Sequence, residues 1–303
     1  MVEYLAESRK TFSRIGIGFG AFLLVSLVLQ FPIGVMMGLL TKVGITVSAD
    51  VLMIVNSLLM YAVGGGITYL IIKDLPLAEE RERITPSPSF FITTFFICIS
   101  LLYIGNMVSL ILMGIVNGIQ GKPTINPIGE VIDQMNTWGI FLSMVVMAPI
   151  FEELFFRKLL IDRVRQYGDK TAIIVSGFVF GLSHGNFYQF FYAFALGAVF
   201  SYIYLRTGKV VYTIIFHAII NFMGSIVALY ILQYQWLSAL YGLFILVSII
   251  AGVVLFIFHW KNLIFNQGEK PVASVVGSGF CNFGMVLFFL LSAAMFLMSE
   301  IIS

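Results

Sequence analysis

Charged residues are scarce in this chain. Only 11% of its residues are Asp, Glu, Lys or Arg, whereas a soluble globular chain carries about 25%. With 60% hydrophobic residues and a mean hydropathy of +1.01, too few polar side chains remain to cover a water-facing surface. The net charge is only +2, and no basic run is longer than a pair, which argues against nucleic-acid binding. We therefore predict a multi-pass integral membrane protein whose surroundings are the lipid bilayer.

Cysteine is nearly absent, and so are long polar stretches. Cys98 and Cys281 both lie in apolar runs, so we predict two small buried thiols rather than a disulfide. The polar segments are all short loops, which predicts one integral membrane domain over 1–303 and no soluble domain. Residues 1–14 precede an apolar run that is too long for the core of a signal peptide, so we expect a retained first membrane helix.

Long hydrophobic runs are what the chain has in abundance. About 20 apolar residues in a helix cross the roughly 30 Å of bilayer hydrocarbon. The runs predict an all-α, polytopic transmembrane helical bundle of about nine spans, or eight if the short run 171–184 or the last run does not cross. The nine runs are 15–40, 51–72, 89–119, 138–156 (helical to about 162), 171–184, 187–205, 210–232, 237–259 and 277–302.

The positive charges alternate between loops. If all nine runs cross, 15 of the 17 Lys and Arg residues lie at the amino terminus or in the loops after the second, fourth, sixth and eighth runs. The opposite side holds only Lys42 and Lys122. By the positive-inside rule the amino terminus is cytoplasmic and the carboxyl terminus external. On that external side, apolar residues at helical spacing in 120–137 predict a short helix lying on the surface.

Ionisable residues inside the apolar runs are the strongest functional signal. Carboxylates and imidazoles are costly in a bilayer and persist there mainly where they line a cavity or carry chemistry. Glu152 and Glu153 are adjacent in the fourth run, so they point about 100° apart on a helix. Arg157 follows Glu153 at the i,i+4 spacing of an ion pair, which would leave Glu152 free to act. The alternative is that both glutamates merely mark the interfacial end of this helix.

Two of the three histidines also lie in apolar runs. His184 ends the fifth run, four residues after Phe180, and the following Gly185 predicts a stop or bend in the helix. His217 and Asn221 lie one turn apart on one face of the seventh run. Taken singly, His184 could be an interfacial histidine and the His217 pair a polar clamp between helices. The third histidine, His259, lies beside aromatic and basic residues, which is typical of an anchor at the headgroups.

The ordered set of three patterns resembles the CPBP family. That family comprises the type II CAAX prenyl endopeptidases and the bacteriocin-processing and immunity proteins, also called Abi proteins. The patterns are Glu-Glu-x-x-x-Arg, Phe-x-x-x-His and His-x-x-x-Asn on successive hydrophobic segments, all met without substitution. The resemblance covers about 138–225, the expected catalytic core helices, and rests on Glu152, Glu153, Arg157, Phe180, His184, His217 and Asn221.

The resemblance implies an intramembrane endopeptidase. Glu152 would be the general base that activates water, assisted by His184, while His217 and Asn221 would stabilise the oxyanion. Glu153, Arg157 and Phe180 would support the site. These roles agree with the chemistry, because peptide hydrolysis needs a base, a positioned water and donors aimed at the developing charge.

The resemblance leaves the cofactor open, because the family is described both as metalloproteases and as glutamate-dependent enzymes without metal. If a divalent ion such as Zn²⁺ takes part, its expected ligands are His184, His217 and Glu152. The chain has no His-Glu-x-x-His pattern, and two histidines plus oxygens match the usual zinc sets incompletely. We favour the version without metal.

The expected substrates are membrane-embedded or lipidated peptides reached from the cytoplasmic leaflet. The compact chain is typical of a bacterial plasma-membrane protein, for which peptide-precursor processing or bacteriocin immunity is the expected pathway. Two alternatives remain: a catalytically silent family member acting as a scaffold or immunity protein, and an ion-coupled transporter that uses the same groups as a relay. The external halves of the runs are nearly devoid of ionisable groups, which disfavours transport.

Overall fold

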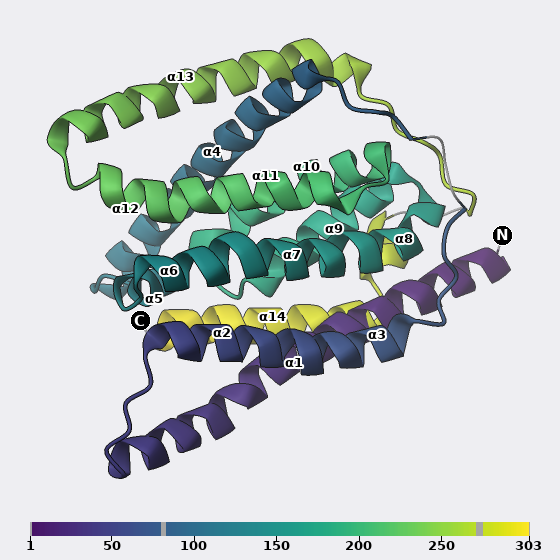
Figure 1. The fold of residues 1–303 in the computed structure, drawn as a ribbon. Coiled ribbons are helices and arrows are strands. Elements are labelled where there is room, and N and C mark those ends of the chain that lie inside the picture. The colour runs from purple at the N-terminus through teal and green to yellow at the C-terminus, as the bar shows by residue number, and fades with distance from the viewer. Residues whose placement is uncertain (1, 80–82, 271–274, 303) are drawn as a thin grey trace.

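The computed structural model describes residues 2–79, 83–270 and 275–302 as a bundle of helices (Figure 1). Among these described residues, eight helical segments are long and apolar enough to cross a membrane, which confirms the predicted all-α, multi-pass architecture. They are Ala6–Lys42, Ala49–Ile72, Pro88–Gln120, Thr137–Tyr167, Phe187–Thr207, Val210–Ile231, Gln235–Asn262 and Phe283–Glu300. The remaining predicted run forms α9 (Asp169–Ser183), whose 15 residues are fewer than a full span needs. The number of candidate spans in the described residues is thus eight, the lower of the two numbers that the sequence predicts.

Several spans are built from consecutive helical pieces. Segments of α-helix alternate with single π-helical turns, which often occur at functional sites, and the fourth span ends in a short 3₁₀ helix. The second span is α2 (Ala49–Leu59), η1 (Met60–Gly65) and α3 (Gly66–Ile72). The fourth is α6 (Thr137–Ile140), η2 (Phe141–Met147), α7 (Ala148–Glu153), η3 (Leu154–Leu159), α8 (Leu160–Val164) and η4 (Arg165–Tyr167). The sixth is α11 (Val210–Phe222), η5 (Met223–Val227) and α12 (Ala228–Ile231).

The other elements are single helices or short turns. The predicted surface helix in 120–137 is present as α5 (Pro127–Asp133), whose apolar residues pack against the fourth and sixth spans. The rest are α1 (Val2–Lys42), α4 (Pro88–Gln120), α10 (Phe187–Thr207), α13 (Gln235–His259), η6 (Trp260–Asn262), η7 (Val275–Phe280) and α14 (Phe283–Ile302).

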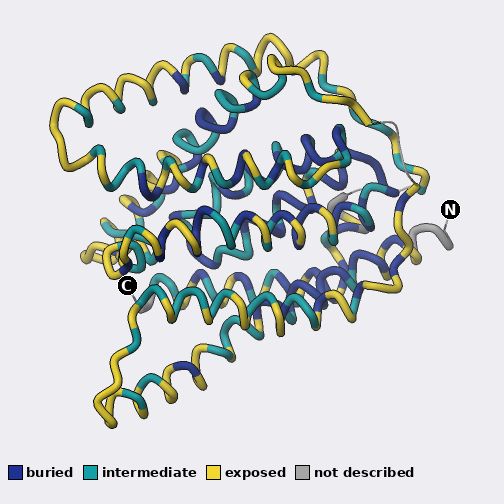
Figure 2. Tube along the Cα trace, in the orientation of Figure 1, coloured by how far each residue is buried: buried dark blue, intermediate teal, exposed yellow. Residues whose placement is uncertain are grey.

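Helices α7, α9, α10 and α11 occupy the middle of the bundle, with α1, α3 and α14 on one side and α4 and α13 on the other (Figure 1). Figure 2 shows buried residues concentrated in this middle layer and exposed residues along the outer helices. Large apolar side chains point outward in the interior of the spans, as Leu110 and Val247 do, which are 53% and 55% exposed. Such surfaces suit lipid rather than water, so the chain is an integral multi-pass membrane protein.

Glycines allow α9 and α10 to pack closely. A Cβ added at Gly177 would lie 3.1 Å from the Phe194 carbonyl oxygen, and one at Gly181 would lie 3.1 Å from that of Phe190. The small-xxx-small spacing in the sequence therefore marks a real contact between neighbouring helices.

The loops between the helices lie at two opposite ends of the bundle. At one end of the bundle, Ile84 N–H donates to the Arg206 carbonyl, and Asp169 N–H donates to the Asn266 carbonyl. At the same end Lys270 Nζ lies 2.7 Å from Glu7, and this contact raises the pKa of the lysine ammonium. The grouping joins the loops that carry most of the positive charge. Which face of the membrane they occupy stays a prediction.

The two cysteines differ in burial. Both are free, as predicted, and Cys98 is buried in α4. Cys281 is exposed, so the prediction of a buried thiol is wrong there. The reason is local: Cys281 lies in the break between η7 and α14 and not within a packed helix.

Candidate active site

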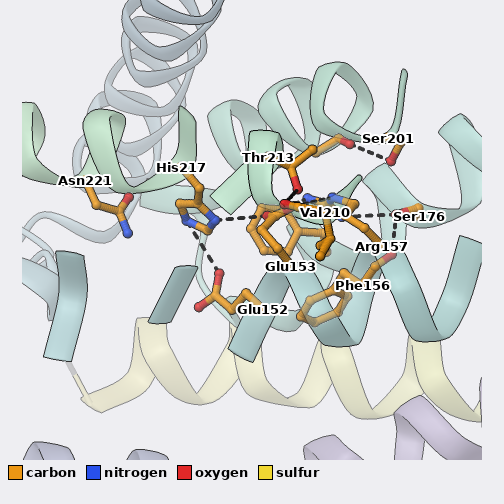
Figure 3. A network of polar contacts seen from close by, with 12 residues as sticks. Glu152, Glu153, Phe156, Arg157, Ser176, Ser201, Val210, Thr213, His217 and Asn221 are labelled. Carbon is orange, nitrogen blue, oxygen red and sulfur yellow. Dashed lines mark hydrogen bonds and ion pairs between the residues drawn. The ribbon is translucent and has the colours of Figure 1, made fainter. Parts of the chain in front are cut away.

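Helix α7 places the two adjacent glutamates in different surroundings (Figure 3). The side chain of Glu153 is 0% exposed and forms an ion pair with Arg157, whose Nε lies 3.0 Å from Oε2. The predicted i,i+4 pair is therefore present. The side chain of Glu152 is 18% exposed and lies outside this pair. One carboxylate is thus enclosed and neutralised, and the other faces an accessible space.

Arg157 is held on all sides although it carries a charge in the middle of the bundle. Its Nη1 donates to Ser176 Oγ at 3.0 Å, and Ser176 in turn donates to the Phe156 carbonyl at 2.9 Å. Its Cζ lies 4.6 Å from the centre of the Phe180 ring, a cation–π contact. Because a buried charge is stable only when it is paired and hydrogen-bonded, these contacts fix the guanidinium in one place.

His217 lies between the two glutamates. Its Nδ1–H donates to Glu153 Oε1 at 3.0 Å, while its Nε2 is 3.7 Å from Glu152 Oε2. The second distance is too long for a direct hydrogen bond, so His217 Nε2 and the Glu152 carboxylate each remain available to another group. The enclosed glutamate therefore orients the imidazole and leaves Nε2 facing the accessible one.

His184 follows the last residue of α9. Its Nδ1–H donates to the Phe180 carbonyl at 2.9 Å, which leaves Nε2 as the free ring nitrogen. The predicted bend is present: Gly185 has a φ of +67°, which favours glycine, and Asn186 caps α10. Among the charges that act on this imidazole, that of Glu152 has the largest effect. The two groups are therefore electrostatic neighbours.

Phe180 connects the three motifs. Its ring contacts His184 at a centroid distance of 4.9 Å and His217 at 5.9 Å, both edge to face. The face of the same ring carries the guanidinium of Arg157. A single aromatic side chain thus sets the spacing between the two histidines and the arginine.

Asn221 forms a contact that joins two helices. Its Nδ2 donates to the Met144 carbonyl at 2.8 Å, which ties α11 to the π-helical turn η2. The sequence spacing of His217 and Asn221 had also allowed such a polar clamp between two helices. Figure 3 shows the amide beside the imidazole on the same side of α11, with His217 between Asn221 and the glutamates.

The structure adds residues that the motifs did not reveal. The Tyr61 ring stacks on Phe151, the residue before Glu152, at 5.1 Å and 13°, and its hydroxyl lies within the electrostatic reach of Glu152. Tyr192 of α10 also lies within the electrostatic reach of Glu152. Tyr61 comes from η1, far upstream of the motifs, where a tyrosine in an apolar run is too common to serve as a signal.

The expected metal ligands do not fit an ion. Within the described parts of the chain, no three side chains of His, Cys, Asp or Glu come together in a way that could hold a metal. The conditional set of Glu152, His184 and His217 is therefore not assembled as a zinc site, and we derive no step through a metal.

Comparison with known proteins locates this site in a described family. Residues 134–223 match the family model "Type II CAAX prenyl endopeptidase Rce1-like". The matched residues include all seven residues of the three motifs. No curated protein and no solved structure matches the chain. Residues 134–223 are therefore a domain of the Rce1-like, type II CAAX prenyl endopeptidase family.

Proposed function

We propose that this protein is an intramembrane endopeptidase that hydrolyses peptide bonds in membrane-associated or lipidated peptides. The observation that carries the proposal is the contrast between the glutamates. Glu153 is fully buried and paired, whereas Glu152 is 18% exposed and faces Nε2 of His217. A partly accessible carboxylate beside two imidazoles provides the groups that hydrolysis requires.

Glu152 acts as the general base in this proposal. It takes a proton from a water molecule, whose oxygen then attacks the carbonyl carbon of the scissile peptide bond. The Tyr61 hydroxyl lies close enough to act electrostatically on this carboxylate and helps to orient it. His184 assists from the other side with Nε2, since its Nδ1 is bonded to the Phe180 carbonyl. The proton then passes to the leaving amine as the C–N bond breaks.

His217 and Asn221 stabilise the oxyanion of the tetrahedral intermediate. In its protonated form His217 has an N–H donor at Nε2, because Nδ1–H is held by Glu153. The Asn221 amide lies one turn along α11 and has a second N–H besides the one bonded to Met144. Donors fixed before the reaction stabilise developing charge best, and the pair of Glu153 and Arg157 fixes His217.

The proposed substrates are amphipathic. An apolar cavity of about 380 Å³ lies between the second and fourth spans, and Tyr61 and Phe151 form part of its wall. Phe151 and Leu154 of its wall directly precede and follow the glutamate pair in the chain, so in this proposal the lipid chain or an apolar side chain of a substrate occupies the cavity while the peptide bond reaches Glu152. The proposed location is the plasma membrane of a bacterium, with maturation of a peptide precursor or bacteriocin immunity as the pathway.

The test is cleavage of a peptide panel by the full chain in lipid vesicles. The peptides share one sequence and carry a farnesyl group, a palmitoyl group or no lipid. We expect the lipidated peptides to be cleaved equally with and without a strong chelator, and His184→Gln to be slower by about 10²- to 10⁴-fold. Chelation that stops cleavage, with recovery on adding Zn²⁺, would overturn the metal-free mechanism. No cleavage of any peptide would favour the catalytically silent alternative.

A further inference from the structure

A second, larger cavity lies away from the glutamates. Its volume is about 580 Å³, within the usual range for small-molecule and lipid pockets. Helices α4, α10 and α13 form its walls, and the segment after α13 closes one end. The lining is dominated by apolar side chains, for example Leu101, Val199 and Phe256.

The cavity and the candidate active site lie on different faces of α10. Val199 and Ile203 line the cavity. The neighbouring Phe200 instead contacts the His217 ring, with centroids 5.5 Å apart. Consecutive residues of a helix point about 100° apart, so α10 separates the two sites. A ligand in the cavity therefore does not reach the catalytic groups.

The polarity of the lining changes along α4. Ser87 and Ser89 stand at the start of the helix, Thr93 and Thr94 follow one to two turns later, and the wall is apolar from Ile97 onward. The 14 residues from Ser87 to Leu101 rise about 21 Å. One leaflet contributes about half of the roughly 30 Å of hydrocarbon. The cavity thus extends from headgroup level to the depth of an acyl chain.

Thr94 provides a polar group without a partner. Its side chain is 7% exposed and lines the cavity, yet its hydroxyl makes no hydrogen bond to another residue in the part of the chain that the structure describes. Because Thr94 lines an apolar cavity, its hydroxyl has no acceptor there unless the occupant supplies one. An ester carbonyl at this depth would supply the acceptor.

We propose that the cavity binds one membrane glycerophospholipid. One acyl chain lies along Leu101, Val199 and Phe256, and an ester carbonyl accepts the hydrogen bond of the Thr94 hydroxyl. The phosphate lies at the rim, near Ser87 and near Asn262, which directly follows a lysine. The amino-terminal end of the 33-residue helix α4 adds a favourable site for the anion.

The bound lipid would complete the packing between α4 and α13. These helices touch directly where a Cβ on Gly252 would lie 2.2 Å from the Phe96 carbonyl oxygen, and where Ser100 Oγ donates to the Ile249 carbonyl at 3.0 Å. The cavity lies beside this contact, along α4 from Ser87 to Leu101, and reaches His259 at the end of α13. The lipid therefore fills a space that protein side chains leave open.

Native mass spectrometry of the full-length protein tests this proposal. The delipidated protein is titrated with a palmitoyl-oleoyl phosphatidylglycerol. We expect one lipid per chain, loss of binding in Val199→Trp, which fills the cavity, and about three- to tenfold weaker binding in Thr94→Val, which removes one hydrogen bond. The matched control is Val254→Trp on the exposed face of α13, which should bind as the parent does.

Three results would overturn the proposal. One is unchanged binding in both Val199→Trp and Thr94→Val, with thermal unfolding showing that each is folded. Another is replacement of the phospholipid by detergent without preference, which would mean an adventitious additive only. The third is displacement of the phospholipid by a farnesylated peptide, which would assign the cavity to substrate. The assay needs no catalysis, so its result is independent of the proposed function.

Discussion

Glu152 and Glu153 show how two identical neighbouring residues acquire different roles. The sequence predicted their division correctly in one respect, because i,i+4 spacing within a helix fixes the pair of Glu153 with Arg157. It could not predict that His217 contacts both carboxylates, since that depends on how α11 packs against α7. Local spacing determines contacts within a helix, and tertiary packing determines the contacts between helices.

Removing the charge of Glu153 should therefore change the stability of the protein more than removing that of Glu152. Glu153→Gln leaves Arg157 as a buried charge without its counter-ion, so we expect a loss of stability of about 3 to 5 kcal/mol. Glu152→Gln removes a partly exposed carboxylate and should leave stability nearly unchanged. Thermal unfolding of the two variants in the same detergent measures the difference. Equal losses would show that the two carboxylates are structurally equivalent.

Tyr61 should position the catalytic carboxylate. Tyr61→Phe keeps the ring stacked on Phe151 and removes only the hydroxyl near Glu152. We expect kcat to fall by about tenfold with KM little changed, because the carboxylate loses a neighbouring polar group. Steady-state kinetics on a lipidated peptide separates the two constants. A rise in KM alone would instead make Tyr61 part of the substrate-binding wall.

At the scale of elements, the apolar runs predicted the helices, and the spacing of glycines predicted some of the contacts between helices. Each predicted run corresponds to a helical segment because a long apolar stretch in lipid has few alternatives to a helix. The π-helical turns inside the second, fourth and sixth spans were not predicted. They depend on side-chain packing between spans and leave no periodic signal in composition.

A comparison of two glycines in α4 tests this packing. A Cβ at Gly105 would lie 2.6 Å from the Tyr192 Cα, whereas one at Gly114 would meet nothing within 4 Å. We expect Gly105→Leu to separate α4 from α10 and to cost about 1 to 3 kcal/mol or more. Gly114→Leu should unfold at the parent temperature. If both variants unfold alike, the close approach of α4 and α10 is not present in the membrane.

At the scale of the whole molecule, charge and structure agree on how the loops group. Most of the Lys and Arg residues lie at one end of the bundle, although the chain passes through that end several times (Figure 1). Helix α9 is short, but its following turn reaches the opposite end, where the Tyr188 hydroxyl donates to the Thr124 carbonyl at 3.0 Å. The basic loops therefore still alternate with the other loops between the two ends of the bundle, although α9 is shorter than a full span.

The predicted orientation can be tested by labelling. In a variant without Cys98 and Cys281, single cysteines replace Lys122 or Lys209. An impermeant maleimide should label Lys122→Cys in intact cells and Lys209→Cys only after permeabilisation, because the positive-inside rule places the basic loops in the cytoplasm. The reverse pattern would mean that the amino terminus is external and that substrates approach from the other leaflet.

The most direct test of the whole account is the rate at which Glu152→Gln cleaves a peptide bond. Single-turnover cleavage of a lipidated peptide should fall by at least about 10²-fold in this variant, because glutamine cannot accept the proton of water. The control is Glu130→Gln on the exposed surface of α5, which should retain the parental rate. Cleavage by Glu152→Gln at the rate of the control would contradict the assignment of Glu152 as the catalytic base.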